Sequence, residues 1–344
     1  MLLVYGAADE HVARDLIHAH VPSRHGTAVC RIGDNLAVVV PEDAPELAAA
    51  LQGCLTELRT GIGHPAVALS DRALAPFGSV VPLGGSATVG GADFALIAGP
   101  CAVESDQQLA DSASMALRGG AVALRGGAFK PRSSPYSFQG LGDEGLRMLA
   151  KVSAASGLPI VTEVVDVMTL HLVAEYADVL QIGTRNAQNF SLIQAAGRTG
   201  KPILLKRGFG CTVSEWLQAA EYVLAEGNPN VILCERGIRS FESSTRFTLD
   251  LSAVAVVKHT SHLPIIVDPS HGVGHRHLIK PMALAAAAAG ADGLMVDIHP
   301  DPEAALCDGN QALTEEEWLD LSSALRGVLA CLGRALPSAE PVGA

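Results

Sequence analysis

The chain has 344 residues, a formal net charge of −12, and 49% hydrophobic but only 4% aromatic residues. Its negative charge argues against nucleic acid or an anionic membrane as a partner, because both would repel it. A large α/β domain occupies roughly 250 residues, so we expect one such domain and a small appendage. No secretion signal or membrane-spanning run is present, and the seven cysteines are scattered as reduced thiols would be. We therefore expect a cytoplasmic protein.

The first seventy residues predict a small α+β domain. The turn Gly33-Asp34-Asn35 favours a hairpin between two apolar runs. The expected elements are a strand at Leu2–Tyr5, a helix at Asp9–Ala19, strands at Thr27–Ile32 and Leu36–Val40, a helix at Pro45–Cys54 and a last strand near Glu57–Thr60. This order is typical of a ferredoxin-like domain at 1–70. The Gly- and Pro-rich residues 71–92 are expected to be a linker.

Residues 93–336 alternate short β-branched runs with helical segments, and 337–344 are expected to be a tail. The strands are predicted at Phe94–Ala98, Ala121–Leu124, Pro159–Thr162, Val179–Ile182, Ile203–Leu205, Val231–Cys234, Ile265–Val267 and Gly293–Ile298. Predicted helices include Asp106–Arg118, Glu144–Ser156, Val213–Ala225 and Pro281–Ala289. Eight βα units with apolar strands favour a (β/α)8 TIM barrel. A doubly wound open sheet is the alternative.

Possible metal ligands follow three of the predicted strands. Cys101 lies in GPCAVES after the first, His271 in DPSHGVG after the seventh, and Asp297, His299 and Asp308 near the eighth. In such a barrel the active site lies where the strands end, so these side chains could converge on one divalent metal. Mixed ligation suits a Lewis acid better than a closed structural zinc site. Alternatively, His271 and Asp308 are merely solvated loop residues.

Basic residues also concentrate at the predicted strand ends. They are Arg125, Lys130, Arg132, Arg185, Lys206, Arg207, Arg236 and Arg239. In a chain with 24 Lys and Arg residues and a net negative charge, this placement predicts a ring of cations around one polyanionic ligand. Any one of these arginines alone is better explained as an ordinary surface charge.

The motifs GPCAVES, LRGGAFKPRSSPYSFQGLG, QIGTRNAQN, LLKRGFG, CERGIR and DPSHGVG together resemble the 3-deoxy-D-arabino-heptulosonate 7-phosphate (DAHP) synthase family, in its order, over roughly residues 93–335. The resemblance is to the type I branch with an N-terminal ferredoxin-like regulatory domain. It implies an enzyme, a transferase that condenses phosphoenolpyruvate with erythrose 4-phosphate in the shikimate pathway of aromatic amino acid biosynthesis.

The resemblance also implies roles for single residues. The metal ligands would be Cys101, His271, Asp297 and Asp308. The residues that hold phosphoenolpyruvate would be Arg125, Lys130, Arg185, Lys206 and Arg236. Arg132 and Ser133 would receive the aldose phosphate, and Lys130 could act as general acid. One divalent metal is implied, manganese first, then iron, cobalt or zinc, and no organic cofactor.

Two positions depart from the family pattern. The family usually has Glu in place of Asp297 and Thr in place of Ser133. The shorter Asp297 is expected to shift the metal or to reach it through water. Arg132 favours erythrose 4-phosphate, because the related 3-deoxy-D-manno-octulosonate 8-phosphate synthases have Asn there and take a longer acceptor. Another aldose phosphate stays an alternative, as does a non-catalytic regulatory barrel.

The resemblance further implies regulation and assembly. The domain at 1–70 would bind Tyr or Phe as an allosteric inhibitor, unless it only stabilises or oligomerises the chain. A homotetramer or another homo-oligomer is expected, with no nucleic acid or membrane partner.

Overall fold

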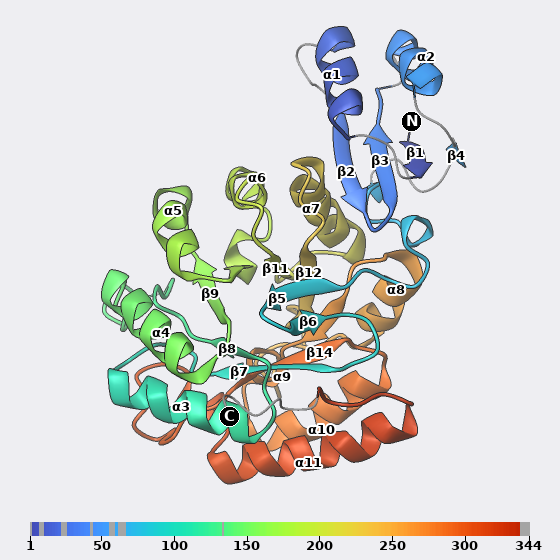
Figure 1. The fold of residues 1–344 in the computed structure, drawn as a ribbon. Helices are drawn as coiled ribbons and strands as arrows, with labels where there is room; N and C mark the ends of the chain where they lie inside the picture. Colours follow the sequence, from blue (N-terminus) through green and yellow to red (C-terminus); the bar gives the residue numbers. More distant parts are fainter. Residues whose placement is uncertain are drawn as a thin grey trace.

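The computed structural model describes residues 2–6, 10–21, 26–41, 44–54, 59–60, 67–132 and 134–337. Within these ranges a small antiparallel unit precedes a closed parallel barrel (Figure 1). Ser133 and residues 338–344 of the expected tail lie outside the described residues. In the described part, none of the helices has the length and apolar character needed to cross a bilayer.

The N-terminal unit has the predicted ferredoxin-like order. Its elements are β1 (Leu2–Gly6), α1 (Glu10–His20), β2 (Ala28–Ile32), β3 (Asn35–Val39), α2 (Pro45–Cys54) and β4 (Arg59–Thr60). The sheet order is β2-β3-β1-β4, and each neighbouring pair is antiparallel. The hairpin predicted at Gly33-Asp34-Asn35 joins β2 to β3, where Gly33 takes a φ of 58° that suits glycine.

Alternate side chains of this small sheet point to opposite faces. Buried side chains lie on both faces. Val29, Leu36 and Val38 pack under α1 and α2. Cys30 and Ile32 point the other way and belong to the core that the barrel shares. Strand β2 contacts α7 (Val213–Ala225), so the unit lies against the outer helices of the barrel (Figure 1).

Eight parallel strands close the barrel. They are β7 (Ala95–Gly99), β8 (Ala123–Arg125), β9 (Ile160–Val164), β10 (Val179–Ile182), β11 (Ile203–Lys206), β12 (Val231–Glu235), β13 (Ile265–Val267) and β14 (Gly293–Asp297). Strand β14 pairs with β7 from Gly293 opposite Ala95 to Asp297 opposite Gly99. This closure confirms the predicted TIM barrel and rules out the open sheet.

Helices surround the strands. They are α3 (Asp106–Arg118), α4 (Asp143–Ser156), α5 (Val167–Tyr176), α6 (Phe190–Gly197), α7, α8 (Ser252–Thr260), α9 (Pro269–Val273), α10 (Arg276–Ala288) and α11 (Glu315–Cys331). The prediction that α10 begins at Pro281 was wrong, because the helix begins five residues earlier, at Arg276. Proline is favoured at a helix start, but here it lies inside the helix and removes one backbone hydrogen bond.

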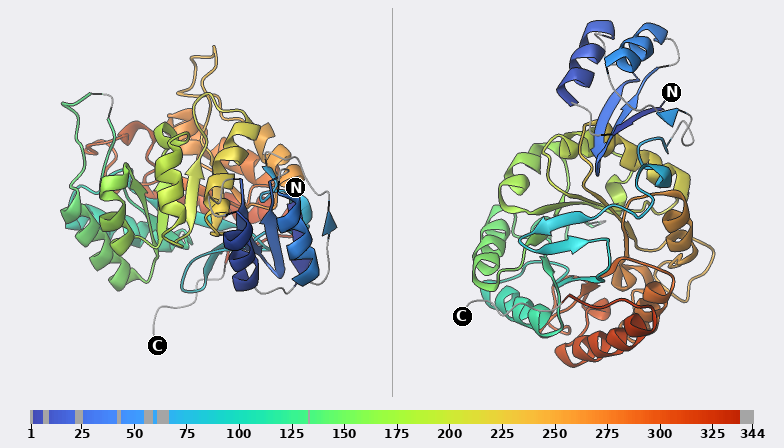
Figure 2. Two further views of the ribbon diagram at one scale, coloured as in Figure 1. Left: turned by 90° about the horizontal axis from the view of Figure 1, so that it is seen from above. Right: turned by 45° about the vertical axis from the view of Figure 1, so that its right-hand side comes forward.

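The predicted linker 71–92 contains structure that the sequence did not suggest. It forms a 3-10 turn, η2 (Arg72–Leu74), and a hairpin of β5 (Val81–Gly84) and β6 (Ala87–Val89). Val81, Leu83 and Val89 pack against inward-facing side chains of the barrel strands. Gly84 lies against Pro159 and Asp178, which precede β9 and β10. The hairpin therefore covers the N-terminal end of the barrel (Figure 2, right).

The packing of the β5–β6 hairpin against the barrel predicts a loss of stability when its core side chains are shortened. Leu83 is 1% exposed, so Leu83→Ala leaves a cavity and should lower the free energy of unfolding by about 2–5 kcal/mol. Urea unfolding followed by circular dichroism measures the change. Leu332→Ala, at a side chain 45% exposed beyond α11, is the control and should shift it by less than about 0.5 kcal/mol. Equal midpoints for the two variants would show that the hairpin is not part of the core.

Candidate active site

A cavity of about 450 Å³ lies at the C-terminal ends of the barrel strands. Eight basic side chains line it, namely Arg125, Lys130, Arg132, Arg185, Lys206, Arg236, Arg239 and Arg246. Only two acidic side chains, Glu163 and Asp308, join them. Such an excess of cations suits a ligand with several negative charges. The predicted ring of cations is therefore present, with two changes in its membership.

Arg207 is not part of the ring. Its guanidinium lies 2.8 Å from the Glu235 carboxylate and 2.9 Å from that of Asp250, and it also donates to the Cys211 carbonyl oxygen. These partners neutralise it behind the cavity wall. Neighbouring residues of a strand point to opposite faces, so Lys206 enters the cavity and Arg207 turns away.

Arg246 is the basic residue that sequence reasoning missed. It lies in the loop between β12 and α8, well beyond the strand end, so position in the sequence gave no signal. Its Nη1 donates to Gln311 Oε1 over 2.6 Å and lies 3.5 Å from Asp308 Oδ1. The loop thus brings a cation to the edge of the cavity beside Asp308.

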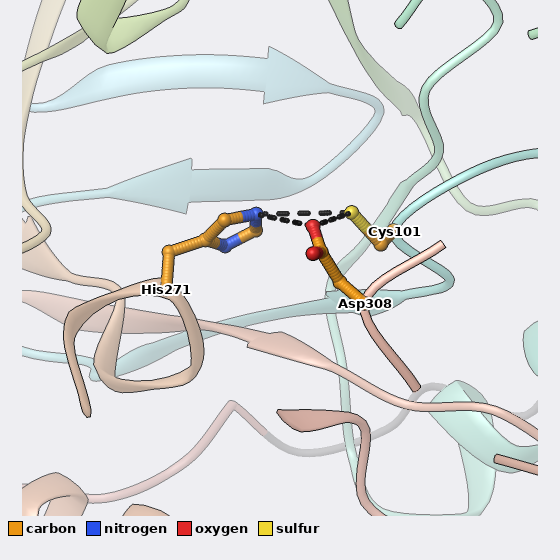
Figure 3. A group of neighbouring side chains, drawn as sticks. All are labelled: Cys101, His271 and Asp308. Carbon is orange, nitrogen blue, oxygen red and sulfur yellow. Dashed lines mark hydrogen bonds and ion pairs between the residues drawn. The ribbon is translucent and has the colours of Figure 1, made fainter. Parts of the chain in front are cut away.

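Three of the four predicted metal ligands lie together. Cys101 Sγ is 3.1 Å from Asp308 Oδ2 and 3.7 Å from His271 Nε2 (Figure 3). His271 Nε2 and Asp308 Oδ2 are 4.0 Å apart. A thiol, an imidazole nitrogen and a carboxylate oxygen that all lie within 4.8 Å of one another can hold one divalent cation. This donor set fits the implied metal.

The fourth predicted ligand, Asp297, lies outside this group. Its Oδ1 accepts from Arg125 over 2.7 Å, and its Oδ2 accepts from Gln311 over 2.7 Å. His271 Nδ1 is 3.5 Å from Asp297 Oδ2. His299 is also elsewhere, with its Nε2 3.5 Å from Glu104.

Local backbone constraints place these side chains. A Cβ at Gly99 would collide with the Arg125 carbonyl oxygen, so glycine lets β7 and β8 approach just before Cys101. Asp268 caps α9 by accepting the His271 backbone N–H over 2.9 Å. Its Oδ2 lies 2.9 Å from His271 Nδ1, which leaves Nε2 facing Cys101. Asp308 takes a φ of 55°, uncommon for a residue other than glycine.

Lys130 and Cys307 flank the Cys101 thiol. The Lys130 ammonium donates to Cys101 Sγ over 3.1 Å and to its carbonyl oxygen over 2.9 Å. Cys307 Sγ lies 3.7 Å away and also accepts from Arg132. The hydrogen bond with Cys307, then burial, raises the pKa of Cys101, while Lys130 opposes the rise. Cys307 was not predicted as a site residue.

Arg236 is held against aromatic rings, and no carboxylate among the described residues is in hydrogen-bond contact with it. Its guanidinium lies 4.2 Å from the Phe247 ring centre and 5.2 Å from that of Phe209. Its Nη1 is buried without a hydrogen-bond partner, and burial lowers its pKa to about 10. It stays charged at neutral pH, so an anionic ligand would supply the missing acceptor.

The chain is thus a closed α/β barrel with a possible metal site beside a cation-lined cavity, an arrangement suited to binding anions. The family model described as the DAHP synthetase I family matches residues 80–328. The chain belongs to this family.

A phospho-2-dehydro-3-deoxyheptonate aldolase of Thermotoga maritima is 49% identical over 265 residues, covering 77% of this chain and 78% of the relative. A 2-dehydro-3-deoxyphosphooctonate aldolase of Acidithiobacillus ferrooxidans is 36% identical, covering 64% of this chain and 83% of the relative. The crystal structure of a DAHP synthase from Thermotoga maritima matches with a TM-score of 0.78 and 39% identity over 98% of both chains. A truncated form of that organism's enzyme matches 79% of this chain and all of its own, with a TM-score of 0.74 and 44% identity.

Replacing Arg236 and replacing Arg207 should change the free energy of unfolding of the ligand-free protein in opposite directions. Arg236→Met removes a buried charge with an unsatisfied donor, so it should raise the free energy of unfolding of the ligand-free protein by about 1–3 kcal/mol. Millimolar phosphate should raise the Tm of the wild type, and Arg236→Met should abolish this rise. Arg207→Met leaves Glu235 without its cation and should lower the free energy of unfolding by about 3–5 kcal/mol. A loss of stability in both variants would mean that Arg236 is satisfied without an anion.

Proposed function

We propose that the chain condenses phosphoenolpyruvate with erythrose 4-phosphate to give DAHP and inorganic phosphate, the first step of the shikimate pathway. The main support is the cation-lined cavity beside the group Cys101, His271 and Asp308. Both substrates are anions, and their combined charge suits the eight basic residues of the lining. The match to the DAHP synthetase I family supports the same reaction.

Arg125, Lys130, Arg185, Lys206 and Arg236 are proposed to hold the phosphate and carboxylate of phosphoenolpyruvate. All five line the cavity, and Arg236 has a buried, unpartnered Nη1. Lys206 is 2.6 Å from Asp268 Oδ2, so that carboxylate fixes its ammonium at the strand end. These preset charges bind an anion without first having to be ordered.

Arg132 is proposed to receive the phosphate of the aldehyde acceptor, together with Ser133. Arg132, Ser134 and Ser137 line the cavity near the predicted position. The cation at Arg132 favours the short four-carbon acceptor over a longer aldose phosphate. The role of Ser133 stays a prediction.

In the proposed reaction, C3 of phosphoenolpyruvate attacks the aldehyde carbon and a carbon–carbon bond forms. Water then adds to the electron-deficient C2, and the hemiketal phosphate loses inorganic phosphate to leave a 2-keto acid. Lys130, which is buried beside Cys101, is positioned to donate a proton to the new alkoxide.

Cys101, His271 and Asp308 would hold a divalent metal, which when bound supplies a Lewis acid for the aldehyde oxygen. We propose manganese, with iron, cobalt or zinc as alternatives, and no organic cofactor.

The deciding experiment is the release of inorganic phosphate from phosphoenolpyruvate by the purified protein. Erythrose 4-phosphate should cause release, EDTA should abolish it and manganese should restore it. Arabinose 5-phosphate and ribose 5-phosphate are the comparison acceptors, and faster release with either would identify a related synthase instead. No release with any acceptor or metal would favour a binding protein.

Lys130 is tested by Lys130→Met. If the ammonium donates the proton, kcat should fall by about 10²- to 10⁴-fold while bound metal stays unchanged. Lys151→Met is the control, because Lys151 is exposed on α4 and pairs with Asp106 at the outer surface. Steady-state phosphate release and metal analysis of both variants give the readout. Near-normal turnover in Lys130→Met would remove this residue from the mechanism.

The N-terminal unit is proposed to sense Tyr or Phe. Its sheet packs against the barrel core, and the Glu221 carboxylate of α7 accepts the backbone N–H groups of Leu69 and Ser70. A shift of the unit would therefore pull on a barrel helix. The alternative role is stabilisation or oligomerisation alone.

Deletion of residues 1–66 separates these roles. Initial rates with and without 1 mM Tyr or Phe should show inhibition of the full chain and none of the truncated chain. Inhibition that persists after deletion would place the sensor in the barrel. A full chain that neither amino acid inhibits would favour the stabilising role.

We also propose a homo-oligomer, as a tetramer or another assembly, working in the cytoplasm. Tyr136 is 97% and Phe241 101% exposed, and large apolar side chains at such positions are typical of contacts between subunits. The two loops that carry them protrude from the barrel (Figure 2, left). Six cysteines are free thiols, which supports a reducing compartment; they are Cys30, Cys101, Cys211, Cys234, Cys307 and Cys331.

A further inference from the structure

We infer that Asp297 does not bind the metal directly in this chain, and that Gln311 is a positioning residue that holds both Asp297 and the turn carrying Asp308. The metal would then have three protein ligands, Cys101, His271 and Asp308. This inference rests on the proposed function only in that a metal binds, and it departs from the four ligands that the family pattern implies.

The carboxylate of Asp297 is already satisfied on both oxygens. Oδ1 accepts from Arg125 Nη1 and Oδ2 from Gln311 Nε2, each over 2.7 Å. The three residues are buried, with exposures of 0%, 3% and 2% for Asp297, Arg125 and Gln311. One charged and one neutral donor, each on a different oxygen, fix the orientation of the carboxylate.

Turning Asp297 toward a metal would be unfavourable. Arg125 also donates to the Pro100 carbonyl oxygen, and its buried Nε lacks a hydrogen-bond partner. In the ligand-free protein, loss of the Asp297 contact would remove the carboxylate that pairs with this buried guanidinium. The ion pair therefore holds the carboxylate where it is.

Asp297 also lies on the other side of the imidazole. Its Oδ2 is 3.5 Å from His271 Nδ1, whereas Nε2 of that ring faces Cys101 and Asp308. A Glu at this position would be longer by one methylene and could reach past the ring. The shorter Asp instead stays on the Nδ1 side of the ring, where Arg125 and Gln311 hold it.

Gln311 connects Asp297 to the turn that carries Asp308. Its backbone N–H donates to the Asp308 carbonyl oxygen over 3.1 Å, across the short turn η4 (Gly309–Gln311). Its side-chain oxygen accepts from Arg246 over 2.6 Å. Asp308 has a left-handed backbone, which persists only where the surroundings hold it. Gln311 restrains the turn, because its side-chain N–H donates to Asp297.

The test is the affinity of the full-length, metal-stripped protein for Mn²⁺, measured by competition with a fluorescent chelator. Asp308→Asn and Cys101→Ser remove ligands and should weaken binding by more than about 100-fold. Gln311→Leu and Asp297→Asn remove outer support and should weaken it by about 10-fold. Asp297→Glu should tighten binding, because the longer side chain can add a ligand.

The visible spectrum of the Co²⁺-loaded protein provides a second readout, because it reports the ligands around the ion. Asp297→Asn should leave this spectrum as in the wild type, and Asp297→Glu should change it. Gln107→Leu, at an exposed glutamine on α3, is the control and should leave both readings unchanged. Circular dichroism checks folding, and Gln311→Leu with Asp297→Glu still decides the matter if Asp297→Asn does not fold.

The inference is overturned if Asp297→Asn weakens Mn²⁺ binding as much as Asp308→Asn and alters the Co²⁺ spectrum, if Gln311→Leu and Gln107→Leu behave alike, or if the wild type binds no Mn²⁺. Phosphate release is scored separately. A wild type with the predicted metal behaviour but no release would contradict the proposed reaction and leave this inference standing.

Discussion

The buried carboxylate of Asp268 joins the metal side of the site to its anion side. It receives the His271 backbone N–H, lies 2.9 Å from the same imidazole and 2.6 Å from the Lys206 ammonium. Burial alone would raise the pKa of Asp268, but His271 and Lys206 hold it well below its usual value. The carboxylate therefore stays ionised, and both neighbours keep their orientation because of it. Without this charge, the imidazole would lose its direction and Lys206 would be a buried cation without a partner.

The same balance of charge distinguishes structural cations from those that face a ligand. Arg207 has two carboxylates and contributes to the packing behind the cavity. Arg236 has aromatic rings instead and keeps an unsatisfied donor. A protein of net charge −12 can thus present a positive cavity, because its buried carboxylates neutralise some basic residues and leave others free. Among the cations of the lining, Arg236 is the one whose buried, unsatisfied donor an anion would satisfy.

Much of this arrangement could be predicted from the sequence, for a physical reason. Strands buried on both faces must be apolar throughout, so all eight barrel strands appear as short apolar runs, and the residues after them gather at one end. That reasoning found Cys101, His271 and Asp308, which the structure brings together.

The sequence failed where tertiary contacts decide. The hairpin of β5 and β6 lies in a Gly-rich segment whose composition predicts a linker, so its strands were not predicted. Arg246 reaches the cavity from a loop far from the strand end. The orientation of Asp297 depends on contacts with Arg125 and Gln311, and these contacts form only in the folded chain.

The β5–β6 hairpin limits how ligands can enter and leave the cavity. Because Val81, Leu83 and Val89 fill the N-terminal end, the barrel offers no passage through its axis. Everything that reaches the cavity must arrive and depart by the same mouth, between the loops at the opposite end. A molecule held deep among the strand ends, near Lys206, is then covered by whatever binds above it at the loops. Two molecules bound at the same time would therefore have to share this one opening.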